Sequence, residues 1–253
     1  MRFPDFAVST LGCPGLPLGR VAALLRAHGV AGVELRCAPD EPVHTGLSPA
    51  ARRAARAALD GLRVVTLASY VNLTSGGAGL AEHLDLARDL GAATLRLMPG
   101  GTGRSEEHLG PAAETLAKAV VLARGSGVRL VVETHDAFLN GADLRRLFER
   151  AGVGTEAGVV WDALHPWRAG ETPAATAAAL GPWLAEVQVK DVAGSHDLTP
   201  VVPGRGSVPN AEIVELARRQ GFTGPVVLEL EARWYPDAPS LDAAIEGARG
   251  LAG

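Results

Sequence analysis

The chain of 253 residues contains only two cysteines, Cys13 and Cys37, and their separation matches no metal-binding or redox motif. A disulfide scaffold is therefore excluded, and a reduced chain in a reducing compartment is expected. Both cysteines follow early apolar segments, so we interpret each as a small buried hydrophobic residue. Aromatic residues are also scarce, at 4% of the sequence.

The sequence also lacks a long hydrophobic run and an excess of basic charge. No apolar stretch approaches the roughly 18 residues typical of a membrane span, and the start, MRFPDFAVST, lacks the features of a signal peptide. The net charge is −4, and Lys and Arg are scattered, which argues against a nucleic-acid or anionic-membrane surface. A cytoplasmic protein without nucleic-acid or membrane partners is expected.

Three common catalytic motifs are absent. The sequence contains no G-x-x-x-x-G-K-[ST] phosphate loop, and its glycine-rich segments at 100–103 and 204–206 do not match a dinucleotide fingerprint. There is also no G-x-S-x-G nucleophile turn. These absences exclude the best-known nucleotide-dependent and serine-hydrolase chemistries.

What the sequence does contain is a regular alternation of short apolar runs with Ala- and Leu-rich helical segments. Ser48-Pro49 and Thr172-Pro173 each place a capping side chain before a proline at a helix start. Gly91 and Gly152 fall where helices should end. The predicted strands cover residues 6–12, 32–36, 63–69, 93–98, 128–133, 158–162, 185–191 and 225–231.

Eight strands alternating with helices predict a parallel sheet, because parallel neighbours require a crossover connection. The length is close to the roughly 250 residues of a (β/α)8 barrel. An open doubly wound sheet is the alternative, but polar residues inside strands, such as Glu34 with Arg36 and Thr94 with Arg96, favour closure around an interior. We predict one α/β domain, a TIM barrel, over residues 1–253.

Four apolar runs in the C-terminal half end in an acid or an amide: Glu133, Asp162, Gln188 and Glu229. In a closed barrel the ends of consecutive strands surround one mouth, where barrel enzymes keep their chemistry. Converging carboxylates repel one another, and burial raises their pKa values unless a cation neutralises them. The pattern therefore predicts a divalent-metal site with these four side chains as ligands.

Other polar side chains flank these four positions. Lys190 shares a strand face with Gln188 and either binds a substrate oxygen or pairs with an acid, and Glu231 is interpreted as a rim acid. His135 and His165 follow Glu133 and Asp162 closely, and an imidazole there could bind substrate or act as a base.

More distant residues complete the predicted pocket. Arg205 lies in a Gly-rich loop that could reach over the mouth, while Trp167 and Tyr70 are candidate pocket walls. Arg96 either touches substrate or forms a buried ion pair with Glu34, and we favour the pair. Asp191 begins the loop before Arg205, and we interpret it as structural.

The segments VRLVVETHDAF, VVWDALHPWRAG, EVQVKDV, PGRGSVP and GFTGPVVLELE resemble the xylose-isomerase-like TIM-barrel superfamily. Within it the chain is similar to the sugar phosphate isomerase/epimerase group, which includes ketose 3-epimerases and hydroxypyruvate isomerase. The similarity is strong over 128–231 and continues more loosely from GVELR through ASYVNL to LRLMPGG. It therefore covers nearly the whole chain.

The resemblance implies that Glu133, Asp162, Gln188 and Glu229 bind the metal and that Glu133 and Glu229 act as the acid/base pair. It also implies that His165 and Arg205 bind substrate oxygens. Many members carry His at the position of Gln188, whereas hydroxypyruvate isomerase-like members carry Gln. The run Glu-Thr-His at 133–135 also resembles the 3-dehydroshikimate dehydratases of the superfamily.

We therefore expect a metal-dependent isomerase or epimerase acting on a small sugar, sugar acid or keto-polyol through an enediolate. An oxygen-rich site favours Mn²⁺ or Mg²⁺, with Co²⁺ or Zn²⁺ as alternatives. One alternative function is a metal-dependent dehydratase with His135 as base, and another is a non-catalytic sugar-binding barrel. Homo-oligomerisation is a fold-level expectation.

Overall fold

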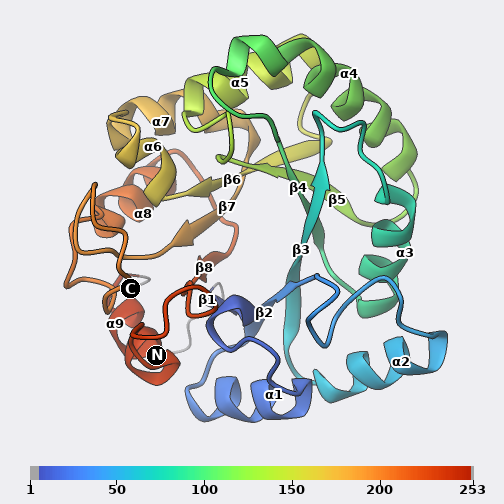
Figure 1. Cartoon of the computed structure of the whole chain (residues 1–253), viewed down its shortest axis with the longest axis vertical. Helices are drawn as coiled ribbons and strands as arrows, with labels where there is room; N and C mark the ends of the chain where they lie inside the picture. Colours follow the sequence, from blue (N-terminus) through green and yellow to red (C-terminus); the bar gives the residue numbers. More distant parts are fainter. Residues whose placement is uncertain (1–5, 252–253) are drawn as a thin grey trace.

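The computed structural model describes residues 6–251, in which eight parallel strands close into a barrel in chain order (Figure 1). The predicted TIM barrel is confirmed, and the open sheet is excluded because β1 pairs with both β2 and β8. The outer limits of the predicted domain, residues 1 and 253, lie outside the described residues. The strands are β1 (Phe6–Ser9), β2 (Gly32–Arg36), β3 (Arg63–Asn72), β4 (Thr94–Met98), β5 (Arg129–Glu133), β6 (Ala157–Asp162), β7 (Leu184–Val189) and β8 (Val226–Leu228).

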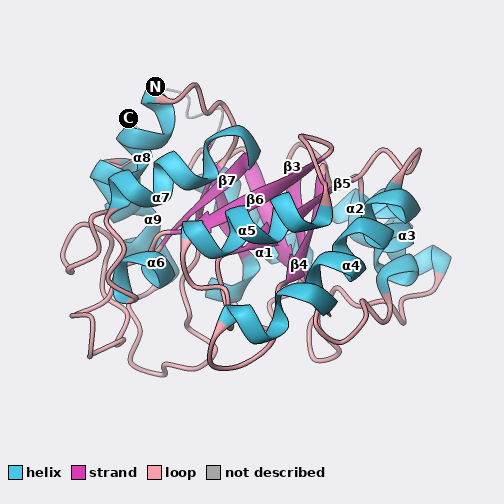
Figure 2. Cartoon of the chain, turned by 90° about the horizontal axis from the view of Figure 1, so that it is seen from above, coloured by secondary structure: helices cyan, strands magenta, loops and turns pink. Residues whose placement is uncertain are grey.

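Helices surround the strands (Figure 1), and the view turned by 90° in Figure 2 shows the strands in the middle of the molecule with helices on both sides. The apolar faces of the helices pack against the outer faces of the strands, which places the main hydrophobic core between the two layers. The helices are α1 (Leu18–Ala27), α2 (Pro49–Ala58), α3 (Leu80–Leu90), α4 (Ser105–Ala123), α5 (Gly141–Ala151), α6 (Leu164–Arg168), α7 (Pro173–Leu180), α8 (Asn210–Arg219) and α9 (Leu241–Arg249), with short 3-10 turns η1 (Thr10–Gly12) and η2 (Gly181–Trp183).

The capping residues and glycines predicted to bound helices lie at helix ends in the structure. Ser48 and Thr172 each accept a hydrogen bond from a backbone N–H of the first turn, and proline follows each of them. Gly91 and Gly152 end α3 and α5 in the left-handed conformation, which glycine adopts without steric cost. These signals fix where each helix starts and stops, and hence which residues lie in the loops at the mouth.

The inside of the barrel is polar where β2, β3 and β7 face one another. Thr66 on β3 donates a hydrogen bond to the Glu186 carboxylate on β7, and Gln188 on β7 donates to Glu34 on β2 at 3.1 Å. β7 is a neighbour of neither β2 nor β3 in the sheet, so both contacts cross the barrel interior. Two buried carboxylates, Glu34 and Glu186, therefore lie beneath the mouth.

The early cysteines lie beside the first two strands. Cys37 follows β2 directly and is buried, whereas Cys13 is half-buried, and both are free thiols. Over residues 6–251, the helices are all too short or too polar to span a membrane.

Candidate active site

The four predicted ligands lie at the carboxyl ends of four consecutive strands. Glu133 and Asp162 are the last residues of β5 and β6, Gln188 is the second-to-last residue of β7, and Glu229 follows β8 directly. The backbone N–H of Glu229 still donates to the Val189 carbonyl at 3.0 Å, which fixes its place at the strand end. All four side chains are buried.

Two basic side chains neutralise the carboxylates at the mouth. The ammonium Nζ of Lys190 is 2.8 Å from Asp162 Oδ2 and also contacts the Glu229 carboxylate. It lies 3.0 Å from Glu231 Oε1, on the rim. Lys190 therefore pairs with acids, one of the two roles left open by the sequence, and its contact with a substrate oxygen stays a prediction.

Arg96 is the second of these cations. Its Nη1 is 2.6 Å from Glu133 Oε2 and 4.0 Å from Glu229 Oε1, so two carboxylates approach the same nitrogen. The expected pairing of Arg96 with Glu34 is wrong: Glu34 is level with Thr66 and Thr94 in the sheet, two residues below Arg96. Arg96 thus reaches the mouth, whereas Glu34 lies beneath it.

Gln188 is held so that one of its atoms has no partner. Its Nε2 donates to Glu34, and its Oε1 is buried without a hydrogen bond from any described residue. A buried acceptor left in this way costs about 1–3 kcal/mol, and an amide oxygen is a suitable ligand for a hard cation. Three carboxylates and an amide oxygen are donors that a divalent metal accepts, but Lys190 contacts Asp162 and Glu229, and the group of ligand atoms within 4.8 Å of one another includes Glu133 without these two acids.

The pKa values of two carboxyls at the mouth are shifted in opposite directions. Burial raises the pKa of Glu133 to about 7, and this effect outweighs the attraction of Arg96. Burial also opposes ionisation of Asp162, but Lys190 and His165 outweigh it and hold the pKa of that carboxyl below its usual value. Glu133 is thus suited to exchanging protons near neutral pH, and Asp162 to remaining charged.

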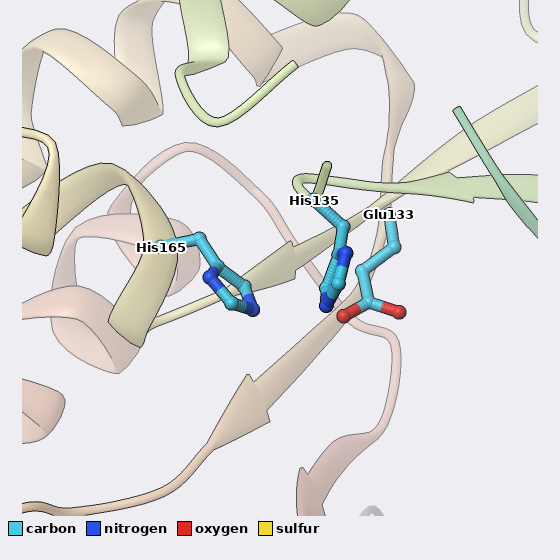
Figure 3. A group of neighbouring side chains, drawn as sticks. All are labelled: Glu133, His135 and His165. Atoms are coloured by element: carbon cyan, nitrogen blue, oxygen red, sulfur yellow. The ribbon is translucent and has the colours of Figure 1, made fainter. Parts of the chain in front are cut away.

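His135 and His165 face each other across the loops that follow β5 and β6. Figure 3 shows both rings and the Glu133 carboxylate turned toward a common space. The ring centroids are 4.5 Å apart in an edge-to-face arrangement. One ligand atom from each of Glu133, His135 and His165 lies within 4.8 Å of the other two, and this is the one such group of His, Cys, Asp and Glu among residues 6–251.

The two imidazoles differ in their surroundings. Burial lowers the pKa of His165 to about 4, so this ring is neutral. Burial also disfavours the charged form of His135, but Asp136 and Glu133 outweigh it and raise the pKa of His135. His135 Nδ1 is 2.9 Å from Asp136 Oδ1, which orients the ring.

Tyr70 and Trp167, two of the remaining predicted pocket residues, lie at different depths. Tyr70 is 45% exposed, and its ring lies 5.6 Å from the guanidinium carbon of Arg96. It also borders a cavity of about 210 Å³ that His44 and His83 help to line. Trp167 is half-buried and packs against the hydrophobic core. Tyr70 is therefore connected to the mouth through Arg96.

Arg205 is exposed in the loop after β7. Asp191 anchors this loop by accepting hydrogen bonds from the backbone N–H groups of Gly204, Gly206 and Val208 at 2.9–3.1 Å. The structural role expected for Asp191 is confirmed. It fixes the base of the loop that carries Arg205.

Two residues, one beside the site and one beneath it, are absent from the sequence-based interpretation. Asp136 orients His135 from a positive φ of 52°, the one non-glycine residue among 6–251 with such an angle. No sequence pattern indicates that conformation. Glu186 shares the strand face of Gln188 and Lys190, and that alternation could have revealed it.

Comparisons with known proteins agree with this architecture. No curated protein sequence matches the chain. Among solved structures, the IOLI protein with a zinc atom is similar over 98% of this chain and 96% of its own, with a TM-score of 0.80 and 15% identity. D-psicose 3-epimerase in the presence of D-fructose gives the same coverage, a TM-score of 0.78 and 15% identity.

The probable 3-DHS dehydratase AsbF from Bacillus anthracis is similar over 98% of this chain and 99% of its own, with a TM-score of 0.76 and 14% identity. Identities this low show the shared fold alone. Among these solved structures the fold belongs to an epimerase and to a probable dehydratase. The family model for the xylose isomerase-like TIM barrel matches residues 22–252. The chain therefore belongs to the xylose isomerase-like TIM barrel family.

Proposed function

We propose that the protein is a divalent-metal-dependent isomerase or epimerase of a small sugar, sugar acid or keto-polyol. The reaction proceeds through an enediolate, with Glu133 and Glu229 as the acid/base pair. One observation carries the proposal: Glu133 and Glu229, on different strand ends, both lie within 4.0 Å of Arg96 Nη1. Two buried carboxylates from different strands thus lie close to the same guanidinium nitrogen.

The proton transfers follow from the charges of these residues. Glu133 can take the proton next to a carbonyl as a carboxylate and return it as a carboxylic acid, a role that a positioned Glu side chain can fill. Glu229 delivers or removes the proton on the opposite face or at the neighbouring carbon. Arg96 and Lys190 lie beside the position where negative charge develops and stabilise it.

The metal would be held by Glu133, Asp162, Gln188 and Glu229. A divalent cation bound there would act as a Lewis acid toward the oxygen atoms of the enediolate. The oxygen-rich ligand set favours Mn²⁺ or Mg²⁺ over Co²⁺ or Zn²⁺. The unpartnered Oε1 of Gln188 supports this assignment.

Substrate contacts are assigned to residues that surround the same mouth. His165 and Lys190 border the carboxylates directly and would bind substrate oxygens. His135 is a further oxygen ligand, and Arg205 would reach the substrate from its loop. Tyr70 and Trp167 would form the walls of the pocket.

Solvent isotope exchange tests the proposal. The purified chain with Mn²⁺ is incubated in D₂O with a panel of ketoses and hydroxy-keto acids, and the products are followed by NMR and mass spectrometry. We expect deuterium at the carbon next to the carbonyl. Glu133→Gln should lower the exchange rate about 10²–10⁴-fold, whereas Glu107→Gln on the exposed face of α4 should leave it unchanged. Absence of exchange with every compound in the metal-loaded chain would contradict the proposal.

A dehydratase is the second candidate, favoured by the geometry of His135. Asp136 binds His135 Nδ1 at 2.9 Å, which leaves Nε2 to accept a proton, as in a carboxylate-oriented base. In this reaction His135 removes the proton next to the carbonyl, and the β-hydroxyl departs as water with a proton from an acid. A product lighter by one water supports the dehydratase, and a product of unchanged mass supports the isomerase.

A further inference from the structure

A cavity of about 300 Å³ lies at the amino ends of the strands, on the face of the barrel opposite the mouth. Arg129 and Leu184, the first residues of β5 and β7, border it. The segment 220–224, which joins α8 to β8, forms another side. Because parallel strands all begin at one face of a barrel and end at the other, this cavity is separate from the carboxylates at the mouth.

Arg129 brings an unpaired positive charge to this cavity. Its Nη2 donates to the Ala157 carbonyl at 2.8 Å, whereas its Nε is buried without a hydrogen-bond partner among residues 6–251. Burial lowers the pKa of Arg129, and no carboxylate in the described part of the chain counters this effect. An arginine stays protonated at neutral pH, so this half-buried cation lacks a counter-charge.

The strand next to β5 fixes the position of this guanidinium. A Cβ at Gly158 on β6 would lie 3.0 Å from Arg129 Nη2 and 3.1 Å from its Cζ. A side chain at position 158 would therefore displace the arginine, and glycine permits the close approach. Together with the hydrogen bond to Ala157, this packing holds the cation in place before any ligand arrives, which lowers the entropy cost of binding.

The segment 220–224 offers further hydrogen-bond donors to the cavity. The Gln220 amide and the Thr223 hydroxyl make no hydrogen bond within the described chain, and the backbone N–H groups of Thr223 and Gly224 donate to no carbonyl there. In contrast, the last carbonyls of α8 already accept hydrogen bonds from the N–H groups of Gln220, Gly221 and Phe222. The groups left over around this cavity are therefore mainly donors.

An excess of donors around one cation is the composition of an anion site. The guanidinium presents a planar pair of N–H groups that matches the oxygens of a phosphate or carboxylate. The volume is at the lower end of the range for small-molecule sites. We propose that this cavity binds a small oxyanion, the phosphate or carboxylate group of a metabolite, through Arg129, with Thr223 and Gln220 as further donors. The site uses no residue of the mouth and goes beyond the proposed function.

NMR titration of the ¹⁵N-labelled full chain tests the proposal. Inorganic phosphate and malonate are added in separate titrations, and the stronger response identifies phosphate or carboxylate as the preferred group. We expect the amide signals of Thr223 and Gly224 to shift. Arg129→Met should weaken binding roughly 10–100-fold, because charge-assisted hydrogen bonds are lost, and Thr223→Val about 2–10-fold, because a neutral one is lost.

Arg150→Met, at an exposed position of α5, is the matched control and should bind the anion like the unchanged chain. Thermal unfolding checks that each variant is folded, and Thr223→Val keeps the test decisive should Arg129→Met fail to fold. The proposal is overturned when neither anion shifts the Thr223 and Gly224 signals, or when the folded variants bind like the unchanged chain. Shifts confined to the 204–206 loop at the mouth would also overturn it. None of these results bears on deuterium exchange with Mn²⁺, which tests the proposed function separately.

Discussion

The barrel interior and the barrel mouth both contain fully buried carboxyls, yet they hold them in different charge states. Glu186 in the interior is 1% exposed, and Asp162 at the mouth is 0% exposed. Burial, with the adjacent Glu34, raises the pKa of Glu186 well above its usual value. Burial acts on Asp162 too, but Lys190 outweighs it and lowers the pKa. Because Asp162 and Glu186 are both buried, the ammonium beside Asp162 accounts for the opposite directions of their pKa shifts.

Glu133 lies between these two extremes. It has one cation, Arg96, at 2.6 Å, and burial still raises its pKa to about 7. A group that titrates near neutral pH can accept and release a proton in one catalytic cycle. The comparison therefore predicts that Glu133 transfers the proton, that Asp162 stays ionised, and that Glu186 is a neutral group with a structural role.

The largest expected loss of stability comes from removing the ammonium group of Lys190 at the mouth. Lys190→Met leaves Asp162 and Glu229 buried without their ammonium partner, and loss of one member of a buried pair costs about 3–5 kcal/mol. Urea unfolding followed by circular dichroism measures the change. Lys118→Met, which breaks an exposed pair with Glu114, should change stability very little. An equal, small effect of both variants would remove the basis of the comparison.

A smaller loss of stability is expected at Asp191, where backbone N–H groups, and no cation, stabilise the buried carboxylate. Asp191 is buried and satisfied by the N–H groups of Gly204, Gly206 and Val208. Asp191→Ala should cost about 1–3 kcal/mol, since the donors lose their acceptor, and should expose the 200–208 loop to limited proteolysis. Asp197→Ala, in the neighbouring exposed turn, serves as control. Unchanged proteolysis of the Asp191 variant would show that the loop has another anchor.

The smallest change at neutral pH is expected for Glu186→Gln, because a protonated carboxyl and an amide are both neutral. The raised pKa means that folded Glu186 keeps a proton that the unfolded chain releases near pH 4.5. Stability therefore falls as the pH rises from about 4.5 through the folded-state pKa. Glu186→Gln should remove this part of the pH dependence, measured by urea unfolding at several pH values. A slope identical to that of the unchanged chain would mean that Glu186 is ionised when folded.

The fold was predictable because its signals are local. Mostly apolar segments of five to seven residues predicted all eight strands, and Ser48 and Thr172 predicted two helix starts. Placement of Glu133 and Asp162 at strand ends followed from the same runs. The fold and the strand ends at the mouth could therefore be predicted without knowing the contacts between residues distant in sequence.

The partners of the charged residues were not predictable, because they depend on register between strands. Arg96 was expected beside Glu34, but Glu34 is level with Thr66 and Thr94, so Arg96 extends above it to Glu133. The position of Lys190 among three acids likewise depends on the register of β6, β7 and β8. Asp136 escaped notice because its role depends on a backbone angle that the sequence does not indicate.

The most direct test of the account compares solvent hydrogen exchange into a reactive ketose by three chains: the unchanged protein, Glu133→Gln and Glu186→Gln, each with Mn²⁺ in D₂O. We predict that the unchanged chain and Glu186→Gln introduce deuterium next to the carbonyl at similar rates, and that Glu133→Gln does so about 10²–10⁴-fold more slowly. Exchange that survives in Glu133→Gln, or that is lost equally in both variants, would contradict the assignment of proton transfer to the mouth.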